Sequence, residues 1–401
     1  MHNSISSNTE ALKNTISDVN IRVLVIITLL FITAACTSTP EIEIPEEIAA
    51  MENVAVFAGD AAPLHEIRLN RAAEFGDTDE LFIGWPSGIA VADEGALFMA
   101  DAGEAKIHIY SAEGEYLQSL GRRGEGPGEF NSVFQLRLHN GELYALDTQQ
   151  QRLSVFDASD FSFLRNISLG GGSMDVSGFP VGFEPLTDGR FLATYNRMVR
   201  DGDRLHRTPL LKIMDKNGEE IASDIVDLTP AEMFMIQSET TIQMMSLPFM
   251  RESHFMIDGD ENLVWGYTGQ ILLQFVSLEG EYLRSTYYSR PNPPLDRAAM
   301  LANFEDDAVR ESVRALDIPE TSPAFRSFLV DDENRIWITL YTENEQENEI
   351  WVLDEEGEKL AEFKQPAVNQ LQHVKKSHAY FLEVEEETGL QKIVKYGIEL
   401  I

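Results

Sequence analysis

Short stretches in which apolar and polar residues alternate recur along most of the chain. The clearest unit has two such stretches within residues 88–101, divided by the turn at 93–95, a third at 106–110, and a fourth after the turn at 113–114. Alternation with a period of two is typical of strands that bury one face, and Asp, Asn and Gly suit the turns between them. The unit therefore predicts a four-stranded antiparallel sheet.

This unit repeats, and a repeat of about this length indicates a modular fold. Further copies begin near residues 135, 188, 255, 327 and 371. The last copy ends at Ile401 before its fourth strand, and Glu66–Leu69, upstream of the first copy, can supply that strand. Such closure hides both sheet edges. We expect an all-β, six-bladed β-propeller over residues 63–401, closed by its N-terminal strand; a seven-bladed ring and a β-sandwich are the alternatives.

Two insertions interrupt the repeat, at residues 227–250 and 289–322. The first is rich in methionine, which suits an adaptable binding surface. In the second, Leu295–Leu316 carries an apolar stripe with prolines on both sides, which predicts a short helical insertion. Each insertion joins the last strand of one blade to the first of the next. We therefore expect both on one rim of the channel, either as a binding surface or as a cap.

The first 35 residues have the pattern of an export signal. Lys13 and Arg22 precede an uncharged apolar run at 23–35, and the single cysteine of the chain, Cys36, follows it. The run is too short to span ~30 Å of hydrocarbon comfortably, which takes about 20 residues. We interpret residues 1–35 as a signal peptide; the alternative is a signal anchor with an incidental cysteine. Residues 36–62 carry prolines and many acidic side chains, typical of a solvated tether.

Two resemblances add to this interpretation. The segment Ile32-Thr33-Ala34-Ala35-Cys36 resembles the lipobox of bacterial lipoproteins, although Leu, Val or Ile is usual in place of Thr33. This implies cleavage before Cys36 and a lipid anchor on it. Because Thr37 rather than Asp follows, the resemblance favours the outer membrane of the cell envelope.

The second resemblance is to NHL-type propeller repeats. It is carried by residues 85–91, by Met99-Ala100-Asp101 and by Gly124-Glu125-Gly126-Pro127-Gly128-Glu129-Phe130. The chain as a whole resembles the six-bladed propeller lipoproteins of the NHL/TolB-like group. Some six-bladed propellers are lyases or lactonases that hold a divalent cation in the channel, so the resemblance leaves an enzyme open.

Charge and composition exclude several functions. The chain has 67 acidic and 31 basic residues and a net charge of −36, whereas nucleic acids are recognised by basic faces. One cysteine cannot form an intrachain disulfide or a multi-thiolate metal site. No nucleophile motif is present, so we assign no catalytic residue, and we expect no cofactor unless the chain is a metal-dependent enzyme.

Polar residues on the innermost strands are the candidate ligand-binding positions, because charges inside so apolar a repeat are costly unless paired or hydrated. They are Arg137, Glu184, Arg251, Glu252, His254, Arg326 and His373. We interpret the chain as a lipid-anchored binding or interaction module for an envelope protein, a peptide or a glycan, with its pocket at the channel mouth. The alternatives are a hydrated channel of compensating charges and a lyase or lactonase whose metal ligands would be Glu184, Glu252, His254 and His373.

Overall fold

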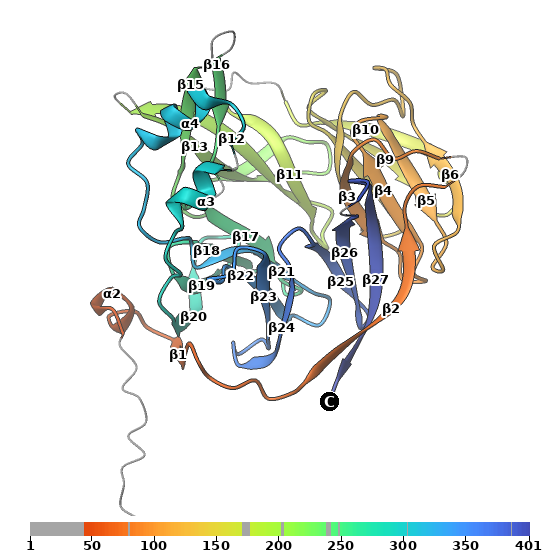
Figure 1. Cartoon of the computed structure of the whole chain (residues 1–401). Coiled ribbons are helices and arrows are strands. Elements are labelled where there is room, and N and C mark those ends of the chain that lie inside the picture. The colour runs from red at the N-terminus through yellow and green to blue at the C-terminus, as the bar shows by residue number, and fades with distance from the viewer. Residues whose placement is uncertain are drawn as a thin grey trace, which may run out of the picture. The chain divides into compact units, whose positions relative to one another are not determined.

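Six sheets follow one another around a ring (Figure 1), which confirms the predicted six-bladed β-propeller. The structure, a computed structural model, describes residues 44–401 except 79–80, 171–176, 202–203, 238–241, 248, 303 and 386. The predicted signal peptide and Cys36 lie outside the described residues. No helix in the described part of the chain is long and apolar enough to cross a membrane.

In each blade the first strand of the repeat lies innermost and the others follow outward in chain order. Blade 1 consists of β3 (Pro86–Val91), β4 (Leu97–Asp101), β5 (Lys106–Tyr110) and β6 (Tyr116–Leu120). Blade 2 consists of β7 (Val133–His139), β8 (Glu142–Asp147), β9 (Arg152–Asp157) and β10 (Phe163–Ser168). Blade 3 consists of β11 (Phe179–Pro185), β12 (Phe191–Asp201), β13 (Arg204–Met214) and β14 (Glu220–Ser223), extended by β15 (Ala231–Gln237) and β16 (Ile242–Met245).

The other three blades follow the same order. Blade 4 consists of β17 (Ser253–Ile257), β18 (Leu263–Tyr267), β19 (Ile271–Val276) and β20 (Tyr282–Ser289). Blade 5 consists of β21 (Phe325–Val330), β22 (Ile336–Leu340), β23 (Glu347–Leu353) and β24 (Lys359–Pro366). Blade 6 consists of β25 (Gln370–Lys375), β26 (His378–Val384) and β27 (Gln391–Leu400), completed by β2 (Ile67–Phe75).

The ring is closed by that strand from the N-terminal side of the first repeat, as predicted. β2 pairs antiparallel with β27, from Ile67 opposite Leu400 to Phe75 opposite Ile393. The first and the last strand of the propeller therefore pair with each other within blade 6, and this pairing closes the ring.

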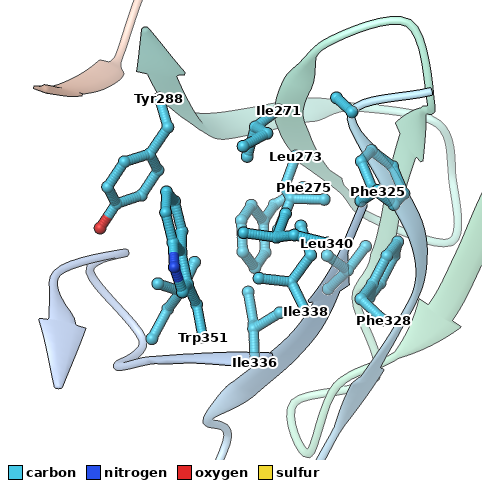
Figure 2. Packing of buried hydrophobic residues seen from close by; sticks show 13 residues of the cluster. Ile271, Leu273, Phe275, Tyr288, Phe325, Phe328, Ile336, Ile338, Leu340 and Trp351 are labelled. Carbon is cyan, nitrogen blue, oxygen red and sulfur yellow. The ribbon is translucent and has the colours of Figure 1, made fainter. Parts of the chain in front are cut away.

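The hydrophobic core lies between neighbouring blades, because the alternating apolar residues of each sheet face the next sheet. Figure 2 shows one such layer, in which Ile271, Leu273 and Phe275 of β19 meet residues of blade 5. Trp351 and Tyr288 extend the layer, with their ring centroids 5.0 Å apart. Each buried side chain of this size contributes about 1.5–3 kcal/mol relative to exposure, so the inter-blade layers hold the ring together.

The predicted tether is structured from Ile44 onward, which differs from the sequence-based expectation for residues 36–62. A short helix, α2 (Glu46–Ala49), precedes β1 (Val54–Ala58), which adds to blade 4 as a fifth strand parallel to β20. The reason is that apolar residues are interspersed among the acids: Ile48 is buried and packs with Leu272 and Tyr287. The acidic composition of the segment predicted a solvated tether and did not reveal these buried apolar residues.

The two insertions pack on each other. β15 pairs with the outer end of the long strand β13, while the second insertion forms α3 (Arg297–Ala302) and α4 (Asp307–Arg314). These elements lie together in Figure 1. The predicted helical insertion is present, as two short helices: Asp306 caps α4 by accepting from the backbone N–H groups of Ala308 and Val309, so a second helix begins there. Phe234 and Phe249 of the first insertion share an apolar cluster with residues of the second.

Candidate ligand-binding site

A β-bulge occurs near the start of five of the six innermost strands. In each of them the register shifts so that one residue has no partner on the second strand. Bulges of this kind re-aim a side chain and are frequent beside binding sites. The bulge residues are Ser87, Phe134, Val181, Arg326 and Gln372. Only β17 of blade 4 continues in unbroken register through its described residues.

Four of these bulge residues line one cavity in the channel, which we call the channel cavity. Its volume is about 400 Å³, within the range of small-molecule sites. Its polar lining residues are Ser87, Gln135, Arg137, Glu184, Thr194 and Gln372. Phe134 adds an aromatic ring that is 41% exposed, so a large apolar face is available to a ligand. The repeat thus directs one side chain from each of several blades toward the same space.

The charges of the channel cavity compensate each other. Arg137 Nε donates to Glu184 Oε2 at 2.6 Å, and its Nη2 donates to Glu184 Oε1. Gln135 Nε2 donates to the same carboxylate at 3.3 Å, and its Oε1 accepts from the Phe183 N–H at 2.8 Å. Arg137 and Glu184 are the charged residues among the described residues that line the cavity. The cavity is therefore polar but close to neutral overall.

His373 lies on β25 next to the bulge residue Gln372. The channel cavity is lined by Gln372 and not by His373. Burial, together with the positive charges of Arg137 and Lys375, lowers the pKa of His373 to about 3. The imidazole is therefore neutral at physiological pH. The sequence pattern singled out His373, because it gives no sign of the bulge that moves the alternation by one residue.

Glu252 and His254, at the start of β17, come together with a residue that the sequence did not point to. Arg207, on the extended part of β13, donates to Glu252 Oε2, and His254 Nε2 lies 3.7 Å from Glu252 Oε1. Burial and the charge of Arg207 lower the pKa of His254, while Glu252 opposes this shift. The lengthened hairpin around Arg207 was the one sequence signal that could have identified this partner.

Arg251 and Arg326 line two separate clefts, so the predicted residues do not form one pocket. Arg326 lies 4.2 Å above the ring of Tyr341 in a cleft of about 260 Å³. Arg251 lines a larger cleft between the two insertions and donates from Nη2 to Thr321 Oγ1 at 2.9 Å. Neither guanidinium has a carboxylate partner in the described part of the chain.

The two carboxylates that the enzyme alternative requires are already paired with arginines. Glu184 is held by Arg137, and Glu252 is held by Arg207. Across the described residues, no three His, Cys, Asp or Glu side chains are grouped so that they could hold a metal ion. The donor set around the channel therefore does not fit a divalent cation, and we derive no metal-dependent step.

A line of Asp, His and Ser side chains runs inside blade 1, but its contacts are structural. Asp101 Oδ2 lies 3.4 Å from His108 Nε2, and His108 Nδ1 lies 2.8 Å from Ser119 Oγ. Asp101 and His108 are fully buried. The Asp101 carboxylate also accepts from the backbone N–H groups of Gly84 and Trp85 at 2.7 and 2.9 Å. The network fixes the loop that enters the blade.

That loop also exposes an aromatic side chain, just before the strand β3 that contributes to the channel cavity. Trp85 is 58% exposed although its backbone is held by Asp101. It stands two residues before Ser87, whose hydroxyl donates to the Val133 carbonyl next to Phe134. At the equivalent place in blade 2, Ser132 is held by Asp147 in the same way, so the fold does not itself require Trp85.

Comparison with known proteins supports the fold. Residues 77–258 match the model of a family described as DUF5128, 6-bladed beta-propeller. A Bacteroides fragilis protein, named as exported, is 13% identical and aligns over 87% of this chain and 99% of its own, with a TM-score of 0.50. No curated protein matches the sequence.

Two further solved structures have lower TM-scores. A DUF4221 family member from Bacteroides vulgatus is 11% identical, over 84% of this chain and 99% of its own, with a TM-score of 0.45. Virginiamycin B lyase from Staphylococcus aureus is 13% identical, over 84% of this chain and 100% of its own, with a TM-score of 0.43. At such identities these likenesses concern the fold alone.

Proposed function

We propose that this chain is a lipid-anchored propeller of the NHL/TolB-like kind, held at the outer membrane of a bacterial cell envelope, that binds a neutral, hydroxyl-rich ligand such as an oligosaccharide. The observation that carries the proposal is the set of bulges that directs Ser87, Phe134 and Gln372 into one channel cavity. A blade does not need such a bulge to form, since β17 forms its blade without one.

The chemistry of the channel cavity favours such a ligand. A sugar ring has apolar C–H faces that pack on an exposed aromatic ring such as Phe134, and a second exposed ring, Trp85, lies two residues before Ser87 in the chain. Side-chain amides and hydroxyls both donate and accept, as sugar hydroxyls do. Because Arg137 and Glu184 neutralise each other, the cavity gives a formally charged ligand little advantage.

Removing the aromatic face tests the proposed ligand class. We expect the Phe134→Ala variant to bind neutral oligosaccharides about tenfold more weakly than the parent, because it loses the buried ring contact. Trp85→Ala should weaken the same ligands. Binding is measured first on an array of neutral and charged glycans and then by titration calorimetry.

Leu164→Ala is the matched control. Leu164 lies in the same blade and is 43% exposed, but it belongs to the outermost strand, β10. It should bind as the parent does. If the parent retains no neutral glycan, or if Phe134→Ala binds as well as Leu164→Ala, the ligand class is wrong.

The lipid anchor is tested separately at Cys36. We expect a Cys36→Ser variant to lose its acyl mass and to leave the membrane fraction, because no other cysteine is present to carry the lipid. Mass spectrometry and membrane fractionation measure the two effects, with Thr37→Ser as the control that keeps the anchor. A Cys36→Ser protein that still sediments with membranes would contradict the assignment.

A further inference from the structure

A second cleft opens between the two insertions and differs in chemistry from the channel cavity. This cleft, which we call the rim cleft, has a volume of about 720 Å³. Strands β13 and β15 contribute Leu205, Met233 and Phe234, and the segment 315–320 after α4 lines it as well. Met250 and Arg251, just before β17, complete it. Eight of its twelve lining residues are apolar, and its size suits a ligand of several residues.

Arg251 gives the rim cleft a cationic group without a carboxylate partner. Its Nη2 donates to Thr321 Oγ1 at 2.9 Å, while its Nε is shielded from solvent and has no hydrogen-bond partner among the described residues. By contrast, the nearby Arg207 is paired with Glu252. A planar guanidinium binds a carboxylate through two parallel hydrogen bonds.

Acidic side chains line the same rim cleft. Asp317 and Glu320 are exposed there, and Glu232 also contributes to the lining. A ligand that carried only negative charge would gain at Arg251 but would be repelled by these carboxylates. A ligand with one negative and at least one positive group satisfies both kinds of charge. The apolar walls additionally require an apolar middle.

We infer that the rim cleft binds a short peptide whose C-terminal carboxylate is held by Arg251. Apolar side chains of the peptide pack against Met233, Phe234 and Met250, and its amino group or a basic side chain lies beside Asp317 and Glu320. Methionine is unbranched and adapts to different partners, so the walls accept a range of apolar residues. This inference does not rest on the proposed oligosaccharide site, because the two cavities share no lining residue.

The probe is a pool of tetrapeptides with Lys first and Leu, Met or Phe at the next three positions, prepared as free acids and as C-terminal amides. We expect the free acids to bind the purified protein and the amides to bind about tenfold more weakly or worse, because the charge-assisted contact with Arg251 is lost. Arg251→Ala should weaken the free acids to the level of the amides and leave the amides unchanged. Binding is followed by native mass spectrometry and calorimetry.

Two controls separate this site from its neighbours. Arg314→Ala removes an arginine of the second insertion that is already paired with Glu311, and it should change nothing. Phe134→Ala should impair oligosaccharide binding and leave the peptides unaffected, so either proposal can fail without the other.

The comparison of acid with amide needs only the unaltered protein, so it decides the matter even if Arg251→Ala folds poorly. Absence of peptide binding, equal binding of acid and amide, or tighter binding of decanoate than of any peptide would each overturn the inference.

Discussion

A chain shortened to begin at Gly76 should fail to fold, or should unfold far below the melting temperature of the full chain. It lacks β2, so β27 is left as an open edge and blade 6 has only three strands. It also lacks Phe75, which is fully buried against Tyr110 and Tyr380. Truncation of one buried Phe to Ala already costs about 3–5 kcal/mol, a large part of a typical total of about 5–15 kcal/mol.

The control for this truncation is a chain that begins at Pro63. That chain lacks α2 and β1 but keeps β2, so the ring remains closed and blade 4 still has its own four strands. Circular dichroism should show a cooperative thermal transition for this chain and a much lower transition, or none, for the shorter one. Equal melting temperatures would mean that β2 is not needed to close the propeller.

Replacement of Asp101 with Ala should have the largest effect of any single substitution outside the apolar core. The buried carboxylate accepts hydrogen bonds from three backbone N–H groups, those of Gly84, Trp85 and Glu104, and contacts His108. Without it these part-buried donors lose their acceptor, which costs about 1–3 kcal/mol for each group left without a partner. We expect a loss of about 3–5 kcal/mol in the free energy of unfolding, measured with urea.

Asp93→Ala is the matched control, because Asp93 lies in the same blade but is exposed. Exposed ion pairs contribute about 0–1 kcal/mol, so this variant should remain close to the parent. Asp101→Asn keeps one acceptor oxygen and should fall between the two. A small effect of Asp101→Ala would show that water replaces the carboxylate and that the network is dispensable.

The same carboxylate predicts a pH dependence. Burial alone would raise the pKa of Asp101, but the hydrogen bonds from His108 and from the backbone outweigh burial and hold the pKa well below its usual value. A pKa lower in the folded than in the unfolded chain stabilises the fold above about pH 4, and this contribution is lost as the pH falls further. The stability difference between the parent and Asp101→Asn should therefore be constant from about pH 5 to 8 and shrink below about pH 4.

The blades and their closure were predictable from the sequence because the signals are local. Each strand alternates apolar and polar residues, and an acidic or glycine-containing turn follows it, as in β3 and β4. Both signals can be recognised without knowing which strand is the partner. The strand at Ile67 was identified because the last repeat lacked one. By contrast, β1 was hidden in an acidic segment, where the apolar residues that pack on blade 4 are few.

The candidate site was harder to predict because it depends on small shifts of register and on contacts between distant segments. A bulge at Phe134 directs an aromatic residue into the channel, where alternation alone suggests a polar lining. Arg207 and Glu252 meet only because β13 extends beyond its blade. Arg251 and Arg326 belong to separate clefts because the packing of the two insertions, not the strand pattern, decides what lies around them.

The most direct test of the account is a crystal structure of the protein with a neutral oligosaccharide selected on the glycan array. We expect a sugar ring packed on Phe134 within the channel cavity, with hydrogen bonds from its hydroxyls to the side chains of Gln135 or Gln372. A sugar that bound to the outer strands of the blades and not in the channel cavity would contradict the proposed function.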